Sequence, residues 1–181
     1  MNLRRWALLG ILFPALLLLA RTAPAQTPGF GGVAWGTPAG ELESFLKLKR
    51  IGAVDYYVNL NERYEIPGFP KPVVFYGFLD GKLYAAYVRL DSAAAYASMK
   101  KDLTAKYGAP KVKQESDTVI NRWQEGEVKI KLKADMKNAV MKLAYYYEPA
   151  GKDRNVLSEE LDAGSFKDLM KEWERESIKL K

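Results

Sequence analysis

Two residue types with catalytic and metal-binding chemistry, cysteine and histidine, are absent from the 181-residue sequence. Their absence excludes a Ser-His-Asp triad, a Cys-His pair and the usual zinc and copper sites. It also excludes disulfide bonds and the lipid-bearing cysteine that follows a lipoprotein signal. Carboxylate chemistry is left, but the aspartates fall mainly at expected turns and helix caps, and no spacing pairs two acids across a cleft. We therefore expect no catalytic residue, metal site or cofactor, with a carboxylate-based hydrolase as a remote alternative.

Long hydrophobic runs are lacking outside the first 25 residues. There, Arg4 and Arg5 precede an apolar run over residues 6–20, and Ala23-Pro24-Ala25 follows. This order is typical of a secretory signal peptide cleaved near Ala25. The run is shorter than the roughly 20 residues that cross a bilayer, and no later run approaches that length. The expected mature chain is periplasmic or secreted, has no transmembrane segment and, having no disulfides, fits a bacterial envelope.

Strong net charge is lacking as well. The chain has 28 basic and 22 acidic residues, for a net charge of +6, and three of the arginines belong to the predicted signal peptide. The mature chain therefore carries about +3, a mild bias that by itself indicates neither nucleic acid nor an acidic lipid surface as a partner. We expect no nucleic-acid partner.

A predicted β-hairpin over residues 73–90 organises the rest of the chain. Two β-branched and aromatic runs are joined there by Asp80-Gly81, a pair that tolerates the positive φ of a tight turn. With a two-residue turn, Tyr76 pairs with Ala85 and Val74 pairs with Tyr87. The turn type decides this register, since a bulge at Gly81 would shift the partners.

The remaining pattern predicts helices alternating with groups of strands. The order indicates an α+β fold, an antiparallel sheet with helices on one face, built from two α-β-β-β units and a C-terminal helix. Residues 26–150 then form a single domain, and residues 151–181 form a linker and a helix that docks on it. The predicted helices cover residues 37–50, residues 91–108 and a segment starting near Ser165, and the other predicted strands cover residues 53–60, 118–124, 128–133 and 139–148.

Two short motifs resemble a known group of proteins. Residues 32–38, GVAWGTP, lead into Glu41-Leu42, and residues 103–110 read LTAKYGAP. These segments are similar to motifs of many uncharacterised exported bacterial proteins, whose expected fold is like that of beta-lactamase inhibitor protein and the SmpA/BamE-type envelope proteins. The resemblance implies a curved sheet that binds another protein and implies no catalytic residues; we expect that partner to be another envelope protein. BamE-like proteins are lipoproteins, whereas this chain has no lipid-bearing cysteine.

The first functional hypothesis is a non-catalytic protein-binding or envelope-assembly module. Tyrosine and arginine are enriched in protein-binding hot spots, and the outward face of the predicted sheet combines both types. The alternative interpretation places these tyrosines in the core or at its rim, with their hydroxyls reaching water. The candidate binding residues are Tyr57, Tyr76, Tyr87, Arg89, Arg122 and Tyr146.

The second hypothesis is the binding of an anionic ligand or envelope surface. Lysines alternate with apolar residues over residues 128–133, which gives the predicted strand one dry face and one basic face. The alternative is a lysine face that serves only solubility. The residues of this basic face are Lys129, Lys131, Lys133 and Lys142.

Overall fold

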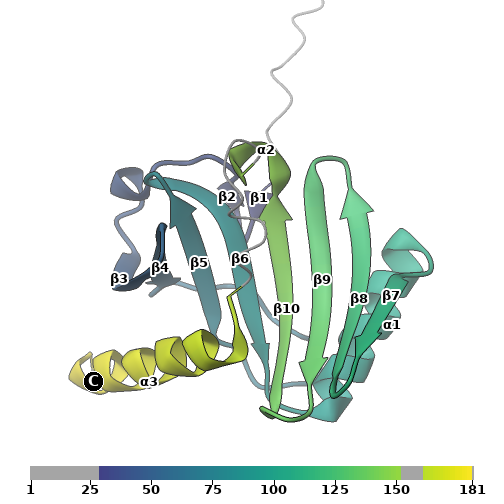
Figure 1. Cartoon of the computed structure of the whole chain (residues 1–181). Coiled ribbons are helices and arrows are strands. Elements are labelled where there is room, and N and C mark those ends of the chain that lie inside the picture. Colours follow the sequence, from purple (N-terminus) through teal and green to yellow (C-terminus); the bar gives the residue numbers. More distant parts are fainter. Residues whose placement is uncertain (1–28, 152–160, 181) are drawn as a thin grey trace, which may run out of the picture.

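The structure, a computed structural model, describes residues 29–151 and 161–180 (Figure 1). The predicted signal peptide and residues 152–160 of the predicted linker lie outside these ranges. Within the described residues, no helix combines the length and apolar composition needed to cross a membrane. The small elements are β1 (Gly29–Phe30), β2 (Val33–Ala34), the 3₁₀ helix η1 (Ala39–Glu41) and α2 (Glu148–Gly151), and the long helices are α1 (Ala93–Tyr107) and α3 (Ala163–Lys179).

Eight strands form one antiparallel sheet in the order β3-β4-β5-β6-β10-β9-β8-β7. The sheet consists of two four-stranded meanders, which join through their last strands, β6 and β10. This arrangement confirms the predicted α+β class and antiparallel sheet. The strands are β3 (Phe45–Ile51), β4 (Val54–Asn59), β5 (Val74–Leu79), β6 (Lys82–Leu90), β7 (Lys111–Glu115), β8 (Thr118–Glu125), β9 (Val128–Asp135) and β10 (Val140–Tyr147).

The helix predicted over residues 37–50 is wrong. The chain makes only η1 there and then enters β3, an edge strand whose Leu46 pairs with Val58 of β4. The spacing of Leu42, Phe45 and Leu46 fits a helix, but it also fits an irregular segment followed by a strand. Pairing with β4 decides between the two, because tertiary context overrides weak local preference. The first half therefore has four strands and the second has α1 followed by four strands, where the prediction gave a helix and three strands in each.

The Asp80-Gly81 hairpin is confirmed, but its predicted register is wrong. Both turn residues have positive φ, 50° and 75°, and Leu79 pairs directly with Lys82. Beyond the turn, a β-bulge places Tyr84 as an extra residue on β6, so that Tyr76 pairs with Ala86 and not with Ala85. Because side chains alternate between faces, this one-residue shift moves the later residues of β6 to the opposite face.

The two long helices pack on opposite faces of the sheet, so the expectation of helices on one face is corrected. Met99 and Leu103 of α1 join one buried cluster, and Phe166 and Leu169 of α3 join the other. In Figure 1, α1 lies behind the sheet and α3 in front of it. The physical reason is that every residue of β5 is buried, so both faces of the central strands need an apolar cover.

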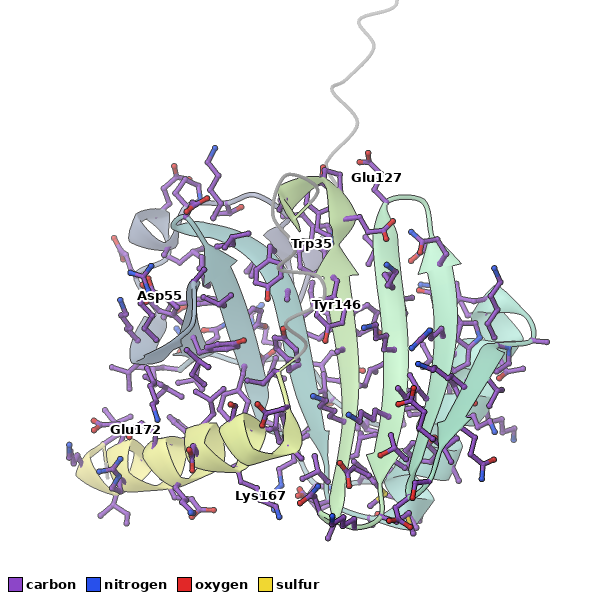
Figure 2. The ribbon with its side chains drawn as sticks, in the orientation of Figure 1. Trp35, Asp55, Glu127, Tyr146, Lys167 and Glu172 are labelled. Atoms are coloured by element: carbon purple, nitrogen blue, oxygen red, sulfur yellow. The ribbon has the colours of Figure 1, made fainter. Side chains whose placement is uncertain are left out.

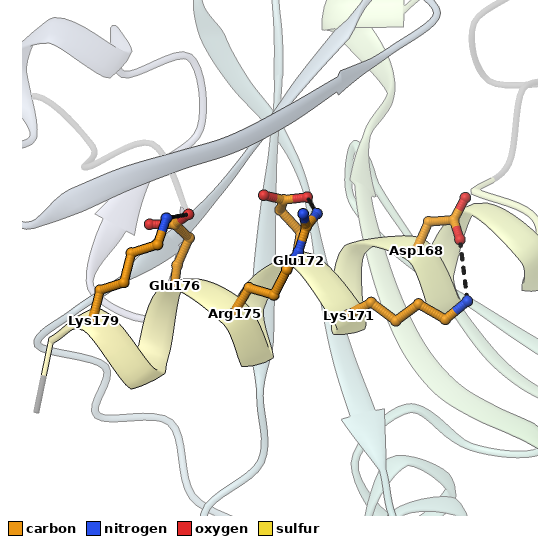
Figure 3. A network of polar contacts seen from close by, with 6 residues as sticks. All are labelled: Asp168, Lys171, Glu172, Arg175, Glu176 and Lys179. Atoms are coloured by element: carbon orange, nitrogen blue, oxygen red, sulfur yellow. Dashed lines mark hydrogen bonds and ion pairs between the residues drawn. The ribbon is translucent and has the colours of Figure 1, made fainter.

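Helix α3 has a dry face and a charged face. Asp162 caps it by accepting a hydrogen bond from the Ser165 amide at 2.8 Å, so the helix begins before the predicted Ser165. Phe166, Leu169 and Met170 are buried against the sheet. The outer side carries three ion pairs one helical turn apart, Asp168–Lys171, Glu172–Arg175 and Glu176–Lys179 (Figure 3).

The N-terminal segment packs closely against a tyrosine-glutamate hydrogen bond of the main sheet and its β4–β5 loop. The Tyr76 hydroxyl donates a hydrogen bond to Glu62 at 2.7 Å, and Gly31 lies so close that a Cβ there would collide with this hydroxyl. Gly32 also has a positive φ, 83° against 60° at Gly31, but a Cβ at Gly32 would meet nothing within 4 Å. Alanine substitutions at the two glycines therefore distinguish the effect of a steric collision from the effect of backbone strain.

We expect Gly31→Ala to lower the free energy of unfolding more than Gly32→Ala. Both variants place alanine in the left-handed region, at a cost of about 1–2 kcal/mol. Only Gly31→Ala adds overpacking, which costs about 1–3 kcal/mol more. Urea unfolding of the two variants measures the difference. Equal losses would show that the Tyr76 hydroxyl does not constrain the segment.

Candidate functional site

The six residues predicted to form an aromatic binding face do not share one exposed surface. Tyr76 faces the α1 side of the sheet, whereas Tyr87 and Tyr146 face the α3 side, and all three are buried. Tyr57 is partly buried against the α1-side cluster, with its ring 4.8 Å from that of Phe78. The β-bulge at Tyr84 separates Tyr76 from Tyr87, because it reverses the orientation of the later residues of β6.

The tyrosines on the α3 side are core residues. The rings of Tyr87 and Tyr146 meet edge to face at 5.6 Å, and Tyr146 lies on β10 on the same side as α3 (Figure 2). Arg89 forms an ion pair with Asp91 at 2.6 Å near the end of β6. Arg89 also lies opposite Lys142 of β10, and Arg122 lies opposite Lys131 of β9. The alternative interpretation, with the tyrosines in core or rim, therefore describes their positions better.

The basic residues of β9 lie together on the side of the sheet opposite α1. Ile130 and Leu132 point into the α1-side cluster, so Lys129, Lys131 and Lys133 point the other way. The register places Arg122 of β8 opposite Lys131, and Lys111 of β7 opposite Arg122. Lys113 of β7 has the same orientation as Lys111. We define the cationic sheet face as Lys111, Lys113, Arg122, Lys129, Lys131 and Lys133.

Neither long helix covers this face. Residues of α1 pack on the other side of the sheet, and α3 packs near β3. Figure 1 shows α3 across the half of the sheet that contains β3 to β6, whereas β7, β8 and β9 have no described helix in front of them. No described helix therefore covers the cationic sheet face, in which Lys111 and Lys113 are exposed, Arg122, Lys129 and Lys133 are partly exposed, and Lys131 is buried.

Lys142, the fourth predicted basic residue, is not part of the open surface. It is 1% exposed, and its ammonium donates a hydrogen bond to the carbonyl of Leu161, just before α3. The same ammonium lies 5.7 Å from the ring centre of Phe166. Lys142 thus helps to attach the start of α3 to β10, which is a structural role.

Three carboxylates lie beside the cationic sheet face. Glu148 binds Lys129 at 2.6 Å, and Glu115 pairs with Lys113. A hydrogen bond and charge attraction from Lys113, together with the charges of Arg122 and Lys133, lower the pKa of Glu115. Hydrogen bonds from Asn138 lower the pKa of Asp135, which burial opposes. The Lys131 ammonium lies 5.0 Å from the Tyr146 ring centre.

Sequence reasoning missed Lys111 and Lys113 as members of this face. Residues 111–115 read KVKQE, and this alternation was a usable signal for an edge strand with its lysines on one side. Arg122 was assigned to a different face because the register between β8 and β9 could not be derived from the pattern alone. Among the described residues, no three acidic side chains gather closely enough to hold a metal ion.

Comparison of the chain with protein-family models, with curated proteins and with solved structures finds no match. The resemblance carried by residues 32–38 and 103–110 therefore stays a prediction. Any functional conclusion must come from the geometry of the chain itself.

Proposed function

We propose that the mature chain is a non-catalytic binding module of the bacterial envelope. Its ligand carries repeated phosphate groups and binds to the cationic sheet face. The observation that supports this most is the row formed by Lys111, Arg122 and Lys131, three cations on directly opposed positions of three neighbouring strands. Neighbouring strands lie about 4.8 Å apart, so these side chains start from a patch about 10 Å wide.

The row is costly for the fold. Like charges on directly opposed positions of an antiparallel pair destabilise the sheet, by an amount of the same order as the 0.2–1 kcal/mol that favourable pairs contribute. No carboxylate lies in this row, whose next member on β10 is Ala144. Real proteins break such local rules mainly at functional or strained sites. A polyanionic ligand would place negative charge against Lys111 and Arg122, which form no ion pair within the described residues.

The position of Lys131 argues against a face that serves only solubility. A solubilising lysine extends into water, whereas Lys131 is 9% exposed and lies against an aromatic ring. Arginine and lysine also suit phosphate, since the planar guanidinium can bind two oxygens at once and the ammonium acts as a point charge. The protein-binding hypothesis has less support, because Tyr76, Tyr87 and Tyr146 are buried.

The proposal predicts salt-sensitive binding to phosphate-bearing ligands. Residues 26–181 should sediment with vesicles containing phosphatidylglycerol, or bind long-chain polyphosphate, and not bind phosphatidylcholine vesicles. Raising the salt from about 50 to about 200 mM should weaken binding at least tenfold, because phosphate contacts release counterions. The two ligands distinguish a lipid headgroup from a soluble polymer as the source of the phosphates. Binding that does not change with salt would contradict the proposal.

A matched pair of variants locates the surface. Lys111→Gln/Lys113→Gln/Lys133→Gln removes three charges from the cationic sheet face and should abolish measurable binding. Lys49→Gln/Lys100→Gln/Lys101→Gln removes three exposed charges from β3 and α1 and should bind nearly as the parent does. Both variants have the same net charge, so equal loss in the two would attribute binding to overall charge and overturn the assignment.

A further inference from the structure

One corner of the cationic sheet face is hollowed into a cavity of about 260 Å³, lined by cationic and aromatic residues. Lys111 of β7 pairs with Arg122 of β8, and two residues further along β8, Gln124 pairs with Lys129 of β9. These four side chains therefore occupy adjoining positions on one side of the sheet. Tyr107, at the end of α1, and Trp123 complete the wall. No carboxylate lines the cavity.

Arg122 is one of the three cations that line this cavity. Its Nε atom is buried, and no described residue accepts a hydrogen bond from it. Within the described ranges, neither Arg122 nor Lys111 forms an ion pair with a carboxylate. An oxyanion in the cavity would accept charge-assisted hydrogen bonds from the guanidinium and from the Lys111 ammonium.

On the Lys129 side, a carboxylate that lies next to the cavity, but not in its lining, already binds the cation. Lys129 binds one oxygen of Glu148 at 2.6 Å, and the Gln124 amide donates to the other oxygen at 3.0 Å. Lys129 is thereby neutralised, which leaves the charges of Lys111 and Arg122 for a ligand. Two available positive charges match a dianion better than a monoanion.

A phosphate monoester carries a charge of about −1.5 to −2 near pH 7, whereas a phosphate diester within a polymer carries one. The cavity is also larger than a phosphate needs, since its volume equals roughly nine water molecules. It can therefore hold the phosphate together with part of its substituent. The wall is held in place, because the Trp123 indole donates a hydrogen bond to the carbonyl of Gly108 at 2.9 Å.

We propose that this cavity binds a terminal phosphate monoester, through Lys111 and Arg122. The inference rests on the proposed function, since the end group belongs to the same phosphate-bearing ligand that the cationic sheet face binds. The rest of the face then holds the repeated phosphates, and the cavity recognises where the ligand ends.

The test compares methyl phosphate with dimethyl phosphate as probes of residues 26–181. In NMR titrations, the side-chain Nε–H signal of Arg122 should shift saturably with the monoester, with an affinity at least tenfold above that for the diester. Lys111→Gln should weaken monoester binding about tenfold or more, the effect of losing one charged hydrogen bond. Arg122→Gln should do the same, and Lys111→Gln keeps the test valid if the Arg122 variant fails to fold.

Lys113→Gln is the matched control, because Lys113 belongs to the cationic sheet face but does not line the cavity. It should leave monoester affinity unchanged and still weaken polyphosphate binding. Equal affinities for the two probes, or no shift at Arg122, would overturn the end-group site. Polyphosphate binding that persists in that case would leave the proposed function standing, whereas loss of both would overturn the two together.

Discussion

Raising the pH above about 10 is expected to unfold the protein steeply, with a midpoint between about pH 11 and about pH 12. The cause is a set of four tyrosines whose pKa values are raised in the folded chain. Burial, opposed by a hydrogen bond with Tyr145, raises the pKa of Tyr64 to about 12. Burial is also the main reason why the pKa values of Tyr76, Tyr87 and Tyr145 lie well above 10.0, the ordinary value.

The sign follows from proton linkage. Unfolded tyrosines lose their protons near pH 10, whereas the folded chain keeps them, so above pH 10 the unfolded state binds fewer protons. Stability is fully present below pH 10 and falls as the pH rises above it. Each tyrosine removes about 1.4 kcal/mol per pH unit, and four together remove about 5 kcal/mol by pH 11. That loss is comparable with the total stability of an ordinary domain, about 5–15 kcal/mol.

Urea unfolding at successive pH values measures this slope, and near-ultraviolet tyrosinate absorbance reports the deprotonation. Tyr145→Phe removes one of the four groups, so its unfolding free energy should fall by about 1.4 kcal/mol less per pH unit above pH 10. The explanation by buried tyrosines would be contradicted if the unfolding free energy of the variant fell with pH as steeply as that of the parent. It would also be contradicted if these tyrosines titrated near pH 10 in the folded chain.

Phe166→Ala is expected to destabilise the whole domain by about 3–5 kcal/mol. Phe166 is 2% exposed, and its ring packs edge to face against Phe75 of β5 at 5.5 Å. Shortening it would open a cavity between α3 and the central strands and would weaken the main apolar contact of the helix. The melting temperature should fall by roughly 10 °C or more for a chain of this size.

Ile178→Ala is the control on the same helix. Ile178 is 72% exposed near the C-terminal end of α3, so its truncation should change stability by less than about 0.5 kcal/mol. The comparison holds helix propensity nearly constant and changes only the docking contact. If Phe166→Ala also cost less than about 1 kcal/mol, α3 would be a loosely attached appendage and not part of the core.

The local signals of the sequence predict most of the second half of the fold. Ser92 and Gly108 delimit α1 through a cap and a positive φ, and Glu125-Gly126 lies between β8 and β9 as expected. The first half is harder to predict from the sequence, because residues 45–51 have a pattern that fits helix and strand alike. The β-bulge at Tyr84 has no local signal. The Tyr84 ring packs beside Gly77, where a Cβ would lie 3.1 Å from it.

The same bulge explains why the residues of the predicted aromatic face lie on two faces of the sheet, whereas the lysines of β9 lie on one face as predicted. The aromatic face required a correct register across β5 and β6, and one extra residue divided it between two faces. The lysines of β9 needed only the alternation within a single strand, which a register error cannot disturb. Their neighbours Lys111 and Arg122 depended on pairing between strands, and the pattern alone does not give that pairing.

The meeting of the two meanders at β6 and β10 bears on how the chain folds. Each meander is built from neighbouring strands, whereas the Leu90–Met141 pair at the seam joins residues far apart in sequence. Long-range pairing is slow, because the loop must close before the contacts form. A half-folded chain therefore presents β6 or β10 as an apolar unpaired edge, prone to self-association. The finished sheet ends in the lysine-bearing β3 and β7, so the risk of aggregation belongs to folding and not to the native state.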